Sequence, residues 1–408
     1  MCKNAKVLLM VSMLFSFATG LSGIFINVFF WRQTNDFVVI VIYNLIHYIV
    51  TPITFLLAGI IAKRKNGILP LRLGLLTYAL FYGLILFVGN KGVPYIYGLG
   101  VVFGIAVGFY WLAFNTLSFD LTDVNNRDTF NGFNGSFCGI SAAVAPITSA
   151  YIINRFTGIR GYNIVFTATL TIFLILVLIS MILKCKNYSS KLNYKKVFSS
   201  NCEEWRVIQK ATVFWGIRDV IIIFLVNILI IETTKSELSL GKFTLAAALI
   251  SSAAYILVQK IIKPARRKIS IIIGTVGSFA AVLALAINIE YKTLLIYTVA
   301  DAFFLPFFII QLSSSTFNVI NQAHEEAMRI EYMINKDIVL NLGRVISGVI
   351  LILLLTIFKN ASILRFYLIF IAFAPMVSGY FLRKLNKVLE GTFIENSKIK
   401  NNLQKKVR

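Results

Sequence analysis

The sequence has 408 residues, of which 58% are hydrophobic and only 14% are charged, and its formal net charge is +23. A soluble protein has about 25% charged residues. This composition excludes an ordinary soluble domain and indicates that lipid, not water, covers most of the surface.

Twelve apolar stretches are long enough to cross a bilayer, whose core of about 30 Å needs ~20 helical residues. Six precede residue 184: Val7–Trp31, Phe37–Ala62, Ile68–Gly89, Pro94–Phe119, Phe133–Phe156 and Tyr162–Leu183. Six follow it: Ala211–Ile231, Phe243–Ile262, Ile269–Ile289, Thr293–Ile320, Ile338–Phe358 and Leu364–Leu382. The first is interpreted as a membrane helix and not as a signal peptide, because its apolar run has no small-residue cleavage site. Since helices satisfy their own backbone groups in lipid, the predicted fold class is an all-α membrane protein.

The stretches form two sets of six around the longest polar segment. We expect an N-terminal bundle at 1–183, a linker at 184–210, a second bundle at 211–386 and a basic tail at 387–408. If the spans alternate, the side of the N-terminus collects 28 Lys and Arg residues and the opposite side nine. This bias predicts that both termini are cytoplasmic. The positive charge then indicates attraction to an anionic cytoplasmic leaflet, and not nucleic-acid binding.

Landmark residues recur at an offset near 200. The matches are Asn27 with Asn227, Lys63 with Lys263, Gly74 with Gly274, Phe114–Asn115 with Phe317–Asn318, and Arg127 with Arg329. They favour a parallel internal repeat with a site between the halves, and the alternative is two unrelated bundles with accidental matches. The repeat also predicts that segments 120–132 and 321–337 are equivalent loops, which place Arg127 and Arg329 near helix ends of the other half.

The helix count, the 6+6 division and the basic loop after the second helix resemble the major facilitator superfamily. Residues 59–67 are similar to the family's G-x-L-A-D-R-x-G-R loop through Gly59, Ala62 and Arg64. Lys63 stands where the family has an Asp that latches the two halves at the cytoplasmic gate. The resemblance therefore implies two pseudo-symmetric six-helix bundles and a transport function, with a departure at this latch.

Two further segments carry the resemblance. Residues 142–150 keep Pro146 of a pattern found in the fifth helix of family antiporters, with Ala or Ser in place of its glycines. Residues 23–27 and the segment around 329–344 resemble poorly characterised members from Gram-positive bacteria. This implies a location in a bacterial plasma membrane.

The resemblance also implies that the first, fourth, seventh and tenth helices line a central cavity. Asp301 and Asp219 would then face water inside the membrane, where an ionisable residue is a functional candidate, and we expect them to carry the coupling proton. Arg218 suits an anionic substrate group or a carboxylate partner. The other substrate-cavity candidates are His47, Asn27, Tyr110, Trp111, Asn115, Trp215, Asn227, Gln311 and Asn318. Helix packing is the alternative role for the aromatic residues, and a hydrogen-bonded structural role is the alternative for His47. A structural role is also the alternative for Arg218, Asp219 and Asp301. The candidates for the cytoplasmic gate are Gly59, Arg64, Arg127, Arg329 and Arg344.

The sequence has no P-loop, no Cys/His cluster and no Ser-His-Asp set, and its four cysteines are isolated. We therefore expect no enzyme activity, no cofactor and no metal. The expected function is a monomeric, proton-coupled secondary transporter that moves a small amphipathic or anionic lipid-like compound by alternating access. Export by antiport is favoured over import. The alternative is a transporter-fold protein that does not transport and instead partners cell-envelope machinery.

Overall fold

The protein is described by a computed structural model that covers residues 2–89, 93–122, 124–185, 190–199, 202–262, 266–322, 328–358 and 363–385. Within these ranges, side chains are not described at 124–128, 220–221, 223 and 321–322. The expected basic tail, 387–408, lies outside the described residues, as does the landmark residue Lys263.

Twelve helices in the described ranges are long and apolar enough to span a membrane, so the predicted fold class is confirmed. The first half contains α1 Lys3–Thr34, α2 Phe37–Arg64, α3 Ile68–Val88, α4 Ile96–Asp120, α5 Val124–Arg155 and α6 Arg160–Ser180. The second contains α8 Glu203–Thr234, α9 Glu237–Ile261, α10 Arg267–Ile287, α11 Tyr291–Gln322, α12 Arg329–Phe358 and α13 Ile363–Arg383. A short helix, α7 Tyr194–Phe198, lies between the halves.

The turn after the first helix is built in the same way in both halves. Asn35 ends α1 with φ of 49°, and Lys235 ends α8 with φ of 53°. In each case the next residue caps the following helix: Asp36 accepts from Val38 N, and Ser236 accepts from Ser239 N. A left-handed residue ends a helix and a short polar acceptor begins the next. The sequence offset of 200 therefore corresponds to a repeated local structure.

Helix packing repeats as well. A methyl group added at Gly74 would lie 2.6 Å from the backbone nitrogen of Tyr110, and one added at Gly274 would lie 2.6 Å from that of Phe308. These glycines let α3 approach α4 and let α10 approach α11 in the same way. The pairs α1–α5, α2–α4 and α3–α6 are matched by α8–α12, α9–α11 and α10–α13. The two six-helix bundles are thus related by internal symmetry and are not two unrelated bundles.

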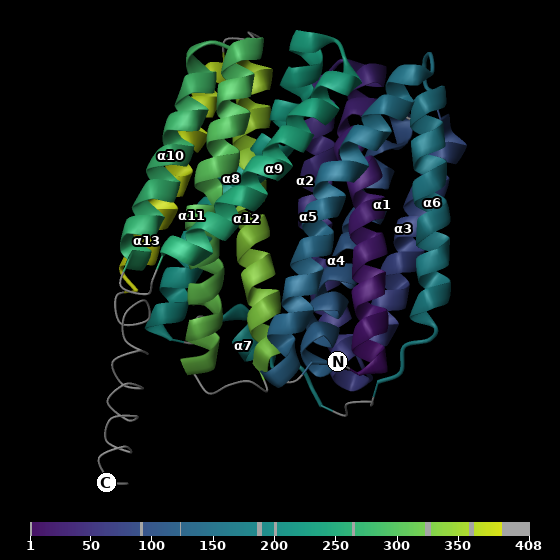
Figure 1. Cartoon of the computed structure of the whole chain (residues 1–408), viewed down its shortest axis with the longest axis vertical. Coiled ribbons are helices and arrows are strands. Elements are labelled where there is room, and N and C mark those ends of the chain that lie inside the picture. The colour runs from purple at the N-terminus through teal and green to yellow at the C-terminus, as the bar shows by residue number, and fades with distance from the viewer. Residues whose placement is uncertain are drawn as a thin grey trace.

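The halves meet along two seams, α2 with α12 and α5 with α9. Each seam pairs the second helix of one half with the fifth helix of the other, as a twofold axis along the bundle requires. Figure 1 shows the two halves side by side, with the N-terminus at the lower end. We call the end of the bundle that carries the start of α1 the N-face, and the other end the opposite face.

Three helices begin eight or nine residues earlier than hydropathy predicted. α5 starts at Val124, α12 at Arg329, and α8 at Glu203 inside the expected linker. Most of segments 120–132 and 328–337 is therefore helix, so the prediction that they are loops was wrong. Polar residues lower the hydropathy of these segments without ending the helices, and some of them, such as Asn131 and Lys336, line a cavity.

Candidate functional site

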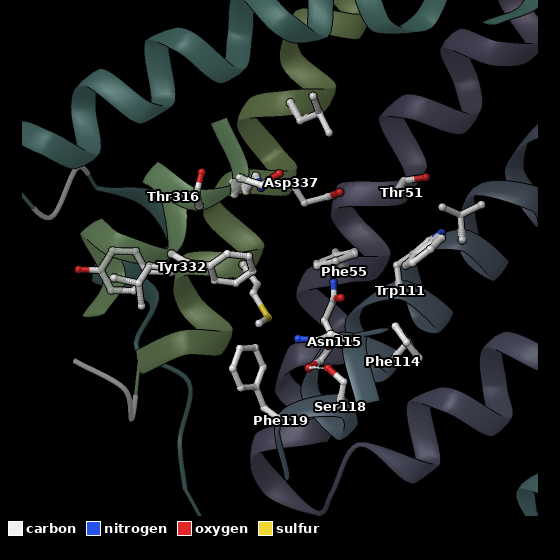
Figure 2. A pocket seen from close by; sticks show the side chains of 18 of the residues that line it. Thr51, Phe55, Trp111, Phe114, Asn115, Ser118, Phe119, Thr316, Tyr332 and Asp337 are labelled. Carbon is white, nitrogen blue, oxygen red and sulfur yellow. Dashed lines mark hydrogen bonds between the residues drawn. The ribbon is translucent and has the colours of Figure 1, made fainter. Parts of the chain in front are cut away.

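A cavity of about 640 Å³ lies between the halves on the side of the N-face. Its wall comes from the N-face portions of α4, α5, α11 and α12, together with α2 and the start of α8. In Figure 2, Phe55, Trp111 and Asn115 of the first half lie across from Thr316 and Tyr332 of the second. Both halves therefore contribute to one site.

The lining combines aromatic rings with amides and hydroxyls. The rings are Phe55, Trp111, Phe114, Phe119, Phe130, Trp205, Phe317 and Tyr332, and the uncharged polar groups are Thr51, Asn115, Ser118, Asn131, Asn134, Ser313 and Thr316. The charged lining residues, Lys336, Asp337 and Arg344, all belong to α12. The cavity thus has one charged wall and is otherwise amphipathic.

A chain of polar contacts runs from the cavity into the second half. Asn341 Nδ2 donates to Asp337 Oδ2 at 3.1 Å, and Arg344 Nη1 donates to Asn341 Oδ1 at 3.2 Å. Arg344 Nε then donates to Asp219 Oδ2 of α8 at 3.1 Å. The Arg344 guanidinium also lies 4.9 Å from the ring of Tyr48, on α2 of the other half. Arg344 therefore connects the cavity, α8 and the first half.

The neighbouring residue on α8 forms a second ion pair. Arg218, 2% exposed, bonds to Asp301 of α11, which also accepts from the Tyr297 hydroxyl at 3.4 Å. Arg218 and Asp219 point about 100° apart on the helix, so they bond to α11 and α12 respectively. Asp301 thus has a cationic partner from another helix, although its own helix has no cation nearby in the sequence.

Comparison with known proteins identifies the fold family. The sequence model described as Major Facilitator Superfamily matches residues 8–330. The chain belongs to the Major Facilitator Superfamily. The structure of the fucose:proton symporter FucP of E. coli covers 93% of this chain and 97% of its own, with a TM-score of 0.62 and 15% identity. At that identity the likeness concerns the fold.

Two relatives come from Bacillus subtilis (strain 168) and Geobacillus stearothermophilus. The first, uncharacterized protein YqgE, is 33% identical over 409 residues, which is 99% of this chain and 94% of the relative. The second, an uncharacterized protein in the sodM 3' region, is 40% identical over 166 residues, covering 41% of this chain and 78% of the relative. Membership of the superfamily, together with the twelve candidate spans in the described residues, makes the protein a multi-pass membrane protein of the transporter class.

At the N-face, the superfamily's loop forms a contact between the halves with an exchanged charge. Lys63, at the position of the superfamily's Asp, lies 3.2 Å from Glu331 of α12, whose side chain is completely buried. Beside it, a methyl group added at Gly59 would lie 2.5 Å from Ile334 Cδ1. The linker joins this contact, because Asn193 N donates to Glu331 Oε1 at 3.2 Å. The expected departure at Lys63 is therefore accompanied by an acid on the partner helix.

At the opposite face, a different set of contacts joins the halves. Arg32 donates to Glu237 Oε1 through Nε at 3.0 Å and Nη2 at 2.9 Å, and the Tyr162 hydroxyl donates to the same oxygen at 2.9 Å. Trp31 Nε1 donates to Glu232 Oε1 at 2.8 Å. The sequence reading missed this clasp, defined as Arg32, Tyr162 and Glu237, because it used span-end charges only to assign topology. Arg32 and Glu232 occupy equivalent positions of the repeat and have opposite charges. This difference between the halves is a signal that could have indicated an ionic contact between them.

The structure brings Trp111, Asn115 and Arg344 to the cavity wall. Asp219 and Asp301 lie behind that wall in their ion pairs. Asn227 and Asn318 are partly buried in α8 and α11 and are not part of the lining.

Other substrate candidates are held inside one half. The Tyr110 ring stacks on Phe15 with centroids 3.4 Å apart, and Asn27 accepts from Asn44 Nδ2 at 2.9 Å. The remaining three pack locally: His47 on Tyr48 at 4.4 Å between centroids, Trp215 on Phe308 at 5.4 Å, and Gln311 donating to Ser270 at 3.5 Å. In this conformation these residues contribute packing and not cavity wall.

The gate candidates are also distributed. Arg64 is exposed, and the Arg127 side chain lies outside the described residues. The Arg329 guanidinium carbon lies 3.6 Å from the ring centroid of Phe119, at the end of α4 in the other half. Arg329 therefore contacts the end of a helix in the other half, and the contact is a cation–π interaction with Phe119.

Lys336 and Asp337 are the charged cavity residues that the sequence reading missed, because they were assigned to a loop. Tyr332, Lys336, Leu340 and Arg344 all line the cavity at a spacing of four residues. This spacing is typical of one face of a helix. This spacing is the sequence signal from which the predicted helix could have been extended toward Arg329, before its apolar part.

Proposed function

We propose that this protein is a secondary active transporter that carries a small amphipathic anion across the membrane by alternating access. The cavity supports this proposal: its described charged lining has two cations and one carboxylate, and aromatic rings surround them. An arginine suits a planar carboxylate or a phosphate. We assign Arg344 and Lys336 to the anionic group of the substrate, and Trp111, Phe317 and Tyr332 to its apolar part.

We further propose that Asp219 couples transport to protons, while Asp301, the other carboxylate expected to carry a proton, braces the fold through its pair with Arg218. Asp219 is bonded to the same Arg344 that an anionic substrate would engage. If the substrate takes this guanidinium, the Asp219 carboxylate loses its counter-charge inside the protein, where an unpaired charge is costly. Binding of a proton then becomes favourable. Proton and anion would bind together, which favours symport over the antiport expected from the sequence.

The proposed location is a bacterial plasma membrane with the N-face in the cytoplasm. The bias of 28 to nine Lys and Arg residues toward the N-face supports this orientation. The relatives from Bacillus and Geobacillus support the bacterial context.

Reconstitution tests the function. The full chain is placed in vesicles that contain a pH-sensitive dye, and aromatic carboxylates, fatty acids and lysophospholipids are added in turn. We expect one class to move protons only when the protein is present, and we expect Arg344→Gln to abolish this signal. Folded protein that moves none of these anions would contradict the proposal and favour the alternative role as a partner of envelope machinery.

A further inference from the structure

The α2–α12 seam is closed along its length. A methyl group added at Gly348 would lie 3.2 Å from Leu45 Cδ1, in the half of the seam near the opposite face. Near the N-face the seam is closed by the Gly59–Ile334 contact and by the buried pair of Lys63 and Glu331. The cations of the cavity, Lys336 and Arg344, lie on α12, one of the two helices of this seam, and the Arg344 guanidinium lies 4.9 Å from the ring of Tyr48 on α2.

The α5–α9 seam is closed only over the half that is remote from the N-face. There Gly241 of α9 packs against Ala150 and Ile147 of α5. The approach between Gly139 and Ser252 is looser, with 3.8 Å from a methyl group added at Gly139 to the Ser252 hydroxyl oxygen. It lies about halfway along both helices.

Below this point the two helices separate. A methyl group added at Gly132 or Gly135 of α5 would have no other heavy atom within 4 Å. Along 129–136, only Phe130 is buried and Asn134 half-buried, and along 252–261 of α9, only Ala254 and Val258 are buried. Figure 1 shows α9 crossing α5 near the opposite face and leaning away from it toward the N-face.

The separation leads into the cavity. Asn131 and Asn134, on the separated part of α5, belong to the cavity wall, and so does Phe317 of α11, which is 47% exposed. The flanks of the separation carry exposed apolar residues, Phe133 on α5 and Ile256 on α9. An opening flanked by apolar side chains at membrane depth faces acyl chains.

We propose that the cavity has a lateral window between residues 129–139 of α5 and 252–261 of α9, through which the apolar tail of an anionic amphiphile exchanges with the adjoining leaflet. The head group lies at Lys336 and Arg344, on the closed seam, and the tail points to the open seam. The arrangement matches an amphiphile because the charged lining residues all lie on α12, at the closed seam, whereas the described lining residues of α5, at the open seam, are uncharged. A fully water-soluble anion needs only the end of the cavity. This inference rests on the proposed function and specifies its substrate class as a single-headed anionic lipid.

A photolabelling experiment tests the window. The full chain is reconstituted in vesicles of phosphatidylethanolamine and phosphatidylglycerol that contain lysophosphatidic acid with a diazirine on its acyl chain. After illumination, labelled peptides are mapped by mass spectrometry. We expect label on cavity residues Trp111 and Phe317, and not only on the lipid-facing surface. Gly135→Trp, which fills the window, should reduce the cavity label to background.

Gly83→Trp of α3 is the matched control, because a methyl group added there also has no heavy atom within 4 Å and Gly83 lies away from the window. It should leave the cavity label unchanged, and equal thermal stability of both variants should show that they fold alike. Cavity label that persists in Gly135→Trp overturns the window.

Transport of phenylacetate separates the window from the function. If phenylacetate is carried with protons while the lipid label stays on the outer helix surfaces, the window is wrong and the transport proposal stands. If the cavity is labelled through the window but no anion moves protons, the window stands and the coupling proposal fails.

Discussion

Two neighbouring side chains of opposite charge on α8 bond to two different helices, and this division suggests different roles. Arg218 and Asp301 are both buried, whereas the partners of the other pair, Asp219 and Arg344, are each about one-fifth exposed. Neither residue of the first pair lines the cavity, whereas Arg344 of the second pair does. We therefore expect the Arg218–Asp301 pair to affect stability most and the Asp219–Arg344 pair to affect coupling most.

Removing one partner of the buried pair should destabilise the protein. Asp301→Asn leaves the Arg218 guanidinium without its counter-charge, which costs about 3–5 kcal/mol for a buried pair. The double variant Arg218→Gln with Asp301→Asn has no net buried charge and should recover most of the loss. Thermal unfolding in detergent measures this. If the single variant unfolds normally but loses proton-driven accumulation, Asp301 acts as a proton carrier instead of a brace.

Removing the competitor of the substrate should tighten anion binding. Asp219→Asn leaves Arg344 without its carboxylate partner, so the guanidinium is available to an anion at all times. We expect the fluorescent anion anilinonaphthalene sulfonate to bind more tightly, and a fluorescence titration measures this affinity. Unchanged affinity would show that Arg344 does not contact the anion, and Arg72→Gln, a change to an arginine of α3 outside the cavity, is the control.

At the scale of single residues, the candidates that lie on the cavity wall are Trp111, Asn115 and Arg344. Other wall residues, such as Phe55 and Thr316, also lie in apolar spans but carry no sequence signal that singles them out. Lys336 and Asp337 were missed because a charged helix end and a loop have the same low hydropathy. The pairing of Asp301 with Arg218 depends on how α8 and α11 are rotated toward each other, which no pattern within either segment reveals.

At the scale of elements, the linker acts as a strap over the α2–α12 seam. Ser190 N donates to the Lys63 carbonyl at 3.1 Å, and Asn335 Nδ2 of α12 donates to the Val197 carbonyl at 2.6 Å. Leu192 and Val197 pack into an apolar cluster with residues of α2 and α12. The strap therefore adds contacts to both halves at the place where Lys63 meets Glu331.

Breaking the Lys63–Glu331 contact should loosen the N-face. Lys63→Met leaves the fully buried Glu331 carboxylate without its cation, which is costly inside a protein. We expect faster reaction of a membrane-impermeant maleimide with a cysteine introduced at Ser313 of the cavity, in a background without native cysteines. The double variant Lys63→Met with Glu331→Leu should return the rate toward that of the parent. Equal rates in all three proteins would show that this seam does not control access.

At the scale of the whole molecule, the fold followed from the sequence more fully than the site did. Twelve spans, the 6+6 division and the repeat depend on hydrophobic length and on local turns such as Asn35–Asp36, which each segment specifies by itself. Which face is open depends on small differences between contacts of two complete halves. The clasp of Arg32, Tyr162 and Glu237, and the separation of α5 from α9, therefore became visible only in the assembled structure.

The cavity is on the side of the N-face, and the clasp joins the halves at the opposite face. Alternating access requires a second state in which the halves meet at the N-face and are separated at the opposite face. Arg32–Glu237 is a partly exposed pair, with side chains 39% and 13% exposed. Such a pair contributes about 1 kcal/mol, so its loss should change the ratio of the two states by about fivefold. Glu237→Gln should therefore increase the population that is open at the opposite face.

Spin labels at Arg160 of α6 and Lys242 of α9 can measure this by pulsed electron resonance, because both residues are exposed near that face and belong to different halves. We expect Glu237→Gln to add a longer distance between these labels. A second pair of labels, at Thr129 of α5 and Lys260 of α9, should show a shorter distance, because the N-face should close as the opposite face opens. Lys235→Gln is the matched control. It breaks the exposed ion pair of Lys235 with Glu232, and both residues of that pair belong to the same half, at the end of α8. A distance change in the control but not in Glu237→Gln would show that surface charge, and not the clasp, sets the balance between the two states.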